Sequence, residues 1–313
     1  MAARWTREMI PRMDDKVAIV TGGNGGLGYE SARGLAAAGA HVVLACRNAA
    51  SAEEAIRRLV GENPAAKVSF LPLDLASLAS VRAFAAAFEQ GHDRLDVLLN
   101  NAGVMALPYR KTADGFEMQL GTNHLGHFAL TGLLLPRIVA TPASRVVTVT
   151  SLMHRAGWVR WDDLQAERHY QTWIRYGQSK LCNLLFAYEL DRRLRSRSLP
   201  VMSLAAHPGY SATNLQGERA RMTGSAFWAT VWRWVNAIAA QPAAMGALPS
   251  LYAATAPDVH GGELFGPSGL FELWGSPRRV SSNRRSRDTK AAARLWEVSE
   301  ALTGVRYAAL GAA

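Results

Sequence analysis

Residues 16–28 read Lys16-Val-Ala-Ile-Val-Thr21-Gly22-Gly-Asn24-Gly-Gly26-Leu27-Gly28, and this stretch decides the fold. The β-branched run over 16–21 predicts a buried strand, and the residues after the glycines follow a helical pattern through Ala38. Glycines let the backbone turn sharply and approach a pyrophosphate, which the positive N-terminus of a helix attracts. A tight turn without a ligand is the alternative, but the flanking strand and helix favour a nucleotide site. The candidate binding residues in this loop are Gly22, Asn24, Gly26, Leu27 and Gly28.

Strand and helix patterns go on alternating after this loop. This order predicts an α/β fold with a single Rossmann-type, doubly wound parallel sheet of about seven strands and helices on both faces. Further strands are expected at 41–46, 67–73, 95–99, 145–150, 201–205 and near 263–265. Further helices are expected at 49–61, 113–139, 170–197 and 243–254.

The chain length predicts one large domain with an extension. With 313 residues, 49% of them hydrophobic, the chain can bury a sizeable core. We expect a catalytic domain at 14–266 and a C-terminal extension at 267–313. Within the domain, segment 211–240 is rich in tryptophan, most densely over 225–240, and three interpretations compete. It is a lid over an apolar substrate, a subunit contact or a membrane attachment, and the lid is favoured.

The charge of the chain is uneven. The formal net charge is +10, and residues 277–290 hold six Lys/Arg and one Asp. A surface that binds nucleic acid would spread its charge more widely and interleave it with aromatic residues, so no nucleic-acid partner is expected. The run predicts a solvated, irregular tail, and weak contact with an anionic membrane is the minor alternative.

Cysteine usage and hydropathy indicate the compartment in which the protein is expected. Two cysteines, Cys46 and Cys182, are too few for a disulfide framework and are typical of buried residues in a reducing compartment. Residues 1–15 contain no signal-peptide core, and no apolar run reaches the roughly 18 residues of a membrane span. The expectation is a cytoplasmic protein without a transmembrane segment.

Residues after the next three strands would complete a dinucleotide site. Arg47 follows the second strand, and no Asp or Glu occurs between Leu44 and Ala52, which favours the 2′-phosphate of NADP(H) over NAD(H). An exposed loop cation is the alternative for Arg47. Asp74 could accept a hydrogen bond from the adenine or could cap the helix that begins near Ser77. Four neighbours join the candidate cofactor site because they lie at strand ends or are small: Leu75, Asn101, Ala102 and Gly103.

A candidate catalytic pair lies four residues apart. Tyr176 and Lys180 share one helix face, and an ammonium near a phenol lowers the pKa of the phenol, which could then act as acid or base near neutral pH. A solvated surface pair is the alternative. Ser151 ends the fifth strand at the edge where such sheets bind ligands. Asn123, an amide in an apolar helix, could hold a water beneath the lysine.

Two further features frame this site. Pro208 and Gly209 follow the sixth strand and would wall the cofactor ring opposite the tyrosine. His124 and His127 share a helix face, but no nearby carboxylate or cysteine completes a metal site, so no metal is expected.

Taken together, these residues resemble the short-chain dehydrogenases/reductases over about residues 14–266. Within this family the chain looks most like the retinol dehydrogenase and protochlorophyllide reductase branch. Three stretches carry that likeness: Ala45-Cys-Arg-Asn48, Thr112-Ala-Asp-Gly-Phe-Glu117 and Asn123-His-Leu-Gly-His-Phe128. The basic tail from Pro277 lies outside the family pattern.

The resemblance implies an NADP(H)-dependent oxidoreductase that interconverts a small apolar alcohol with an aldehyde or ketone. Ser151 would bind the substrate oxygen and Tyr176 would transfer its proton. Lys180 would bind the ribose of the nicotinamide, and Asn123 would hold a relay water. It also implies pairing through helices 113–139 and 170–197, as a homodimer or homotetramer. The alternatives are a catalytically silent NADP(H)-sensing protein and a carbonyl reductase of retinoids or lipids at a membrane surface.

Overall fold

The computed structural model describes residues 4–210 and 241–311, and the predicted lid at 211–240 lies outside the described residues. The described residues form one sheet of eight strands in the order β3-β2-β1-β4-β5-β6-β7-β8. Seven strands run parallel, and β8 is antiparallel to β7. The strands are β1 (Val17–Thr21), β2 (His41–Cys46), β3 (Lys67–Pro72), β4 (Val97–Asn100), β5 (Arg145–Val149), β6 (Met202–Ala206), β7 (Leu264–Pro267) and β8 (Pro277–Val280).

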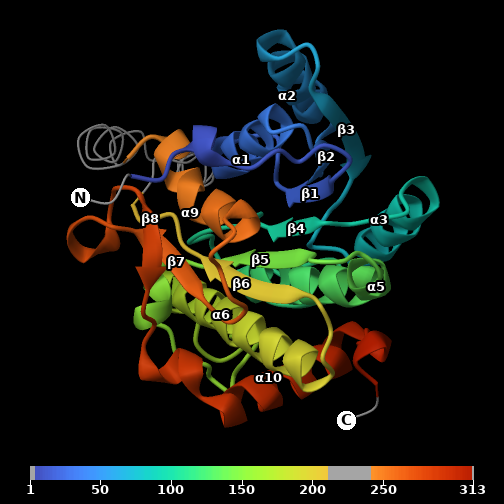
Figure 1. The fold of residues 1–313 in the computed structure, drawn as a ribbon. Coiled ribbons are helices and arrows are strands. Elements are labelled where there is room, and N and C mark those ends of the chain that lie inside the picture. The colour runs from blue at the N-terminus through green and yellow to red at the C-terminus, as the bar shows by residue number, and fades with distance from the viewer. Residues whose placement is uncertain (1–3, 211–240, 312–313) are drawn as a thin grey trace, which may run out of the picture.

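Helices cover both faces of this sheet, which confirms the predicted doubly wound class. Helices α1 and α9 lie on one face, and α5 and α6 lie on the other with α10 beyond them (Figure 1). The α-helices are α1 (Gly26–Ala37), α2 (Ala49–Glu62), α3 (Leu78–Gly91), α4 (Met118–Leu120), α5 (Gly126–Ala140), α6 (Thr172–Ser196), α9 (Ala243–Thr255) and α10 (Thr289–Thr303). Shorter turns are η1 (Arg7–Met9), η2 (Gly121–Leu125), η3 (Leu152–Arg155), η4 (Leu270–Glu272), η5 (Arg284–Arg287) and η6 (Ala308–Leu310).

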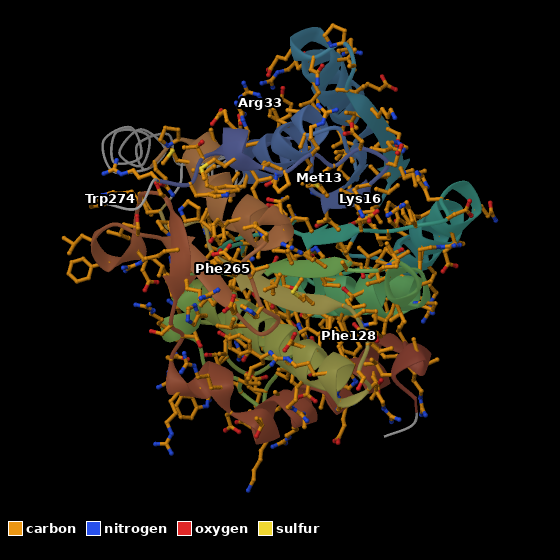
Figure 2. All side chains as sticks on the ribbon, viewed as in Figure 1. Met13, Lys16, Arg33, Phe128, Phe265 and Trp274 are labelled. Carbon is orange, nitrogen blue, oxygen red and sulfur yellow. The ribbon has the colours of Figure 1, made fainter. Side chains whose placement is uncertain are left out.

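The strands are buried on both sides, which explains why they read as continuous apolar runs. In β1, Ala18 and Val20 pack into the core under α1 and α9, whereas Val17 and Ile19 pack into the core under α3, α5 and α6. Phe265 and Phe128 lie inside the molecule, one in each core (Figure 2). Because β1, β4, β5 and β6 run parallel, their carboxyl ends lie at the same edge of the sheet. The site residues follow these strand ends.

The prediction of an irregular tail at 277–290 is wrong, although the charged side chains of this run are exposed, as expected of a solvated segment. Residues 277–280 form the edge strand β8, and Arg279 forms an ion pair with Glu263 at 2.5 Å. An edge strand needs only its backbone to pair, and exposed charges suit an edge because they discourage further strand addition. The carboxylate of Asp288 then caps α10 by accepting the amides of Lys290 and Ala291.

The C-terminal extension covers the outer faces of α5 and α6. Trp296 of α10 and Tyr307 are buried against Phe128 and Phe186, with ring centroids 4.4–5.9 Å apart for most of these pairs. The Tyr307 hydroxyl donates to the backbone oxygen of Phe128 at 2.7 Å. The helices expected to pair two subunits are thus packed, on these faces, against the chain's own C-terminus.

Candidate active site

The loop between β1 and α1 has the geometry of an anion cradle. Gly22 and Gly26 have φ values of +66° and +52°, where other residues are strained. A side chain on Gly28 would collide with the backbone oxygen of Gly22. The N-cap residue Gly25 offers no side-chain hydrogen bond, whereas Asn48 caps α2. The first amides of α1 are therefore free of a side-chain cap and fit a pyrophosphate.

Thr21 holds this loop to the end of β4. Its hydroxyl oxygen accepts the backbone amides of Asn101 and Ala102, each at 2.9 Å, and Asn101 Nδ2 donates to the Thr21 carbonyl at 2.8 Å. His127 Nδ1 donates to the Asn123 carbonyl at 3.0 Å, so its Nε2 accepts from the Thr21 hydroxyl at 2.9 Å. Burial lowers the pKa of His127 to about 4, which keeps the ring neutral. Sequence reasoning did not give Thr21 or His127 these roles.

Asn123 lies in a π-helical turn, η2, that the sequence did not reveal. The predicted helix from 113 begins at Met118 and changes to i→i+5 bonding over Gly121–Leu125 before α5. Such turns are rare in proteins, and those that occur are often found at functional sites. The Asn123 amide bonds the backbone N and O of Val104, at 2.7 and 2.9 Å, and the hydroxyl of Ser179 at 2.9 Å. The side chain thus ties the loop after β4 to α6, and holding a water stays a prediction.

The structure brings the three predicted catalytic side chains together. Ser151 follows β5, and its hydroxyl lies beside the Tyr176 phenol, close enough to lower the pKa of that phenol. Lys180 Nζ lies 5.8 Å from the centre of the Tyr176 ring and donates to the Val149 carbonyl at 3.3 Å. A side chain on Gly103 would approach both Asn123 Oδ1, at 3.1 Å, and Lys180 Nζ, at 3.4 Å. Gly103 therefore leaves open a space that faces both of these polar groups.

The predicted lowering of the tyrosine pKa is wrong for this structure. Burial raises the pKa of Tyr176 to about 12, which outweighs the hydrogen bond from Ser151. Burial also lowers the pKa of Lys180 to about 8. Both shifts have one cause, because loss of water disfavours the charged form of each group. The phenol consequently keeps its proton at neutral pH and is set to donate it.

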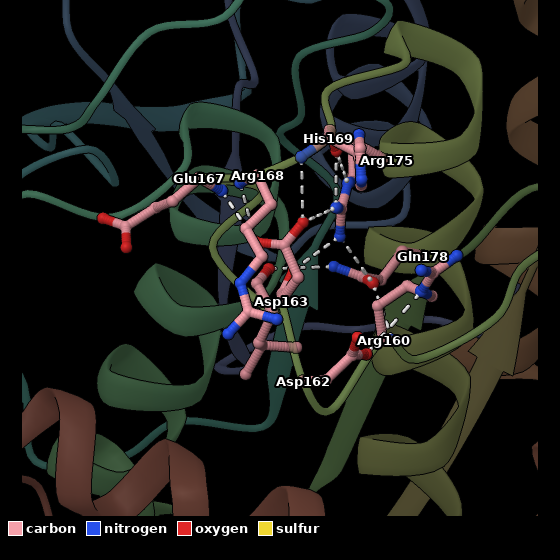
Figure 3. Close-up of polar contacts among 9 residues, drawn as sticks. Arg160, Asp162, Asp163, Glu167, Arg168, His169, Arg175 and Gln178 are labelled. Atoms are coloured by element: carbon pink, nitrogen blue, oxygen red, sulfur yellow. Dashed lines mark hydrogen bonds and ion pairs between the residues drawn. The ribbon is translucent and has the colours of Figure 1, made fainter.

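A buried network anchors the loop between Ser151 and Tyr176 to α6 (Figure 3). Arg175 forms an ion pair with Asp163 at 2.6 Å, and both side chains are almost fully buried. Asp163 also accepts backbone amides at residues 167–169, which folds the loop around its carboxylate. Gln178 completes the anchor by accepting the amide of Arg160 at 3.0 Å. Tyr176 thus projects from a helix turn whose neighbours are fixed.

The other predicted cofactor residues lie along the same edge, with one correction. Arg47 is exposed at the end of β2. Asp74 Oδ1 accepts the amide of Ala76 at 2.9 Å, whereas Ser77 caps α3, so the capping role suggested for Asp74 is wrong. A cap there needs an acceptor at the residue next to the first helical turn, and the serine occupies that position. Buried Leu75 and half-buried Asn24, Leu27, Pro208 and Gly209 complete the set.

The two histidines of the π-turn region bond protein groups. His124 Nε2 lies 2.9 Å from the Ser299 hydroxyl of α10. Within residues 4–210 and 241–311 no three His, Cys, Asp or Glu side chains gather as a metal site would require. The helices of the same residues include none with the length and apolar character that a membrane crossing requires.

A doubly wound sheet with a glycine-rich first loop and adjacent serine, tyrosine and lysine side chains defines a class of dinucleotide-dependent oxidoreductases. Residues 16–224 match the family model described as short chain dehydrogenase. The chain belongs to this family.

Within this family, the chain is similar to several retinol dehydrogenases. Human retinol dehydrogenase 12 is 40% identical over 298 residues, which make up 95% of this chain and 89% of that protein. Human retinol dehydrogenase 11 is 38% identical and covers 97% of this chain and 93% of its own length. Alignments of this extent reach into residues 267–313, beyond residue 224 where the match to the family model ends.

Solved structures agree with this fold. A putative uncharacterized protein from Mycobacterium paratuberculosis has a TM-score of 0.80 at 43% identity, and covers 97% of this chain and 99% of its own. The structure described as the Pseudomonas aeruginosa RhlG/NADP active-site complex has a TM-score of 0.63 at 24% identity, with 82% and 96% covered. The second likeness concerns the fold alone.

Proposed function

We propose that the protein is an NADP(H)-dependent oxidoreductase that interconverts an apolar alcohol with its aldehyde or ketone. One observation carries this proposal: Ser151 and Tyr176, which are far apart in the chain, present adjacent hydroxyl groups at the carboxyl edge of the sheet, with Lys180 beside them. A bound nicotinamide would supply or accept the hydride. The protein would position the substrate against the nicotinamide and would transfer the proton to or from the substrate oxygen.

In the reducing direction the two hydroxyl groups act in sequence. Ser151 donates a hydrogen bond to the carbonyl oxygen as negative charge develops there. Tyr176 then gives its proton to that oxygen, because even a phenol with a pKa of about 12 is a much stronger acid than an alcohol. In the oxidising direction Tyr176 must first lose its proton, so oxidation should become faster as the pH rises.

Lys180 compensates the charge that remains on the tyrosine. With a pKa of about 8 the ammonium is mostly protonated at pH 7. It lies 5.8 Å from the phenol ring, in a buried site where attraction to a phenolate is strong. The donors of Lys180 that do not bond Val149 would bind ribose hydroxyls of the cofactor.

Two features of the chain support the proposed preference for NADP(H). The uncapped N-terminus of α1 would bind the pyrophosphate, and the exposed Arg47 would pair with a 2′-phosphate. The retinol dehydrogenases at about 40% identity support the proposal of an apolar substrate, and a retinoid or another lipid-derived carbonyl is the proposed class.

A membrane surface is a second candidate setting for this reaction. Leu270, Phe271 and Trp274 are 65%, 74% and 47% exposed on one loop, and the exposed Arg278 and Arg279 begin four residues after Trp274. Exposed apolar side chains next to cations are typical of interfacial attachment. Sedimentation of the protein with anionic vesicles, but not with neutral ones, would support attachment to a membrane surface. A protein that sediments with neither kind of vesicle would refute it.

A turnover assay tests the proposed function. Aldehydes, ketones and alcohols, including retinal and retinol, are screened with NADPH, NADH and their oxidised forms. Tyr176→Phe should lower turnover about a thousandfold while NADPH still binds. Tyr188→Phe is the matched control, because that hydroxyl lies on the same helix and bonds Ser282 outside the site. Full activity of Tyr176→Phe would refute the proposal, and NADPH binding without any turnover would favour the sensing alternative.

A further inference from the structure

Glu272, a residue of the C-terminal extension, joins two segments that flank the active site. One oxygen accepts from Arg155 Nη2 at 2.8 Å, and the other is 3.0 Å from His207 Nε2. Arg155 ends the turn that begins after Ser151, and His207 directly precedes Pro208. A single carboxylate therefore connects the chain after β5 with the chain after β6.

The protons in this cluster can be placed from the hydrogen bonds. His207 Nδ1 accepts the amide of Gly209 at 3.2 Å, so Nε2 carries a hydrogen and donates it to Glu272. The hydrogen bond from His207 lowers the pKa of Glu272, and Arg155 lowers it further, so the carboxylate is ionised at neutral pH. Charge-assisted bonds of this kind are stronger than neutral ones. His207 is fully buried and the Glu272 side chain nearly so, which limits screening by water.

The loop that carries Glu272 is closed and strained. Its ends are joined by the bonds from Ser268 N to Ser276 O at 2.8 Å and from Gly269 N to Trp274 O at 2.7 Å. Phe271 and Glu272 have φ values of +53° and +60°, a conformation that costs stability in residues other than glycine. This backbone directs Glu272 inward, whereas Phe271 is exposed and Trp274 lies at the outer edge of the molecule (Figure 2).

The same loop also binds the backbone after Pro208. The amide of Tyr210 donates to the Leu273 carbonyl at 2.8 Å. A side chain on Gly209 would collide with that carbonyl, and Gly209 has a φ of +66°. The loop and the segment at 207–210 are therefore in direct backbone contact.

We propose that Glu272 is a positioning residue of the active site, which fixes the segment at 207–210 relative to the turn after Ser151. The proposal rests on the proposed function, because residues 208 and 209 wall a nicotinamide only if the protein binds that cofactor. Loss of the carboxylate would loosen this wall, while the glycine-rich loop and Arg47, at the adenosine end, stay unchanged.

Glu272→Gln is the test variant, because it keeps the shape and removes the charge and one acceptor. Glu263→Gln is the matched control, since Glu263 also forms an ion pair with an arginine on this side of the molecule but bonds no residue of the site. Glu272→Asp keeps the charge and both acceptors on a side chain one methylene shorter, so it should recover part of the loss. Thermal unfolding checks that each variant folds.

Three measurements separate positioning from a general loss of structure. In the protein without cofactor, hydrogen exchange in peptides covering 207–210 should speed up about tenfold in Glu272→Gln and stay unchanged in Glu263→Gln. NADPH should bind about tenfold more weakly, whereas 2′,5′-ADP, which lacks the nicotinamide half, should bind as before. The kcat for the best carbonyl should fall about ten- to a hundredfold.

The outcomes are distinguishable from those of the proposed function. If the unmutated protein neither binds NADPH nor reduces any carbonyl, the proposed function fails, and hydrogen exchange still tests the tie made by Glu272. Unchanged exchange at 207–210 in Glu272→Gln, or an equal loss of NADPH and 2′,5′-ADP binding, would overturn the positioning role.

Discussion

Replacing Lys180 with methionine should stabilise the protein while it removes activity. Lys180 is 4% exposed, and burial lowers its pKa from 10.5 to about 8. At 1.36 kcal/mol per pKa unit, keeping this lysine charged in the folded state costs about 3 kcal/mol. Methionine has a similar length and carries no charge. The Val149 carbonyl keeps a donor in Asn183 Nδ2 at 3.1 Å, so the substitution leaves no buried acceptor unpaired.

The sign of the pH dependence follows from the direction of the shift. Below pH 8 the lysine is protonated in both states, and the folded state bears the full cost of burying the charge. As pH rises through 8, the folded lysine loses its proton while the unfolded one keeps it, so the cost declines. The stability advantage of Lys180→Met should therefore fall from about 3 kcal/mol at pH 7 to about 1 kcal/mol at pH 9.5.

Urea unfolding of the variant and the unmutated protein at the two pH values measures this advantage. Other titrating groups cancel in the difference between the two proteins. Lys290→Met, at an exposed position of α10, is the control and should change the free energy of unfolding by less than about 0.5 kcal/mol. A Lys180→Met variant that is less stable at pH 7, or whose advantage ignores pH, would refute the burial cost. In that case, burial of the Lys180 charge would not lower the stability of the folded protein.

Three further predictions concern other parts of the chain. Thr21→Val should lower the free energy of unfolding, measured in urea, by about 1–3 kcal/mol, because the part-buried amide of Ala102 loses its acceptor and that of Asn101 keeps only the Leu99 carbonyl; Thr21→Ser should restore most of it. Trp296→Ala should cost about 3–5 kcal/mol, whereas Trp274→Ala should change stability by less than about 0.5 kcal/mol; equal effects would contradict the packing of the C-terminus. Arg47→Asp should reduce the preference for NADPH over NADH at least about tenfold in kcat/KM, and equal use of both by the unmutated protein would defeat the pairing with a 2′-phosphate.

The sheet was predictable because its signals are local. β1, β2 and β5 are short β-branched runs that end at glycines or polar residues, and both of their faces are buried, so pattern and environment agree. Ser151, Tyr176 and Lys180 were found for a related reason: a strand end and a four-residue helical spacing place them without knowledge of the packing. The direction of the tyrosine pKa could not be found this way, because it depends on burial.

Features that depend on distant contacts were missed. The sequence of β8, with its two arginines, does not have an apolar strand pattern, although its backbone pairs with β7 as an edge strand. Trp296 in a charged tail gives no sign that its partner is Phe128, far earlier in the chain. The π-turn at Asn123 and the roles of His127 and Glu272 arise where separate segments meet, which no periodicity records.

The contact between Tyr307 and Phe128 spans 179 positions of sequence and has a consequence for biosynthesis. A ribosome adds residues from the N-terminus, so the aromatic faces of α5 and α6 emerge long before the segment that covers them. Until translation ends, the nascent chain presents exposed apolar surface to chaperones and to other nascent chains. A premature stop codon shortly before α10 would make that transient state permanent, so such truncated products should aggregate or be degraded even though every catalytic residue is present.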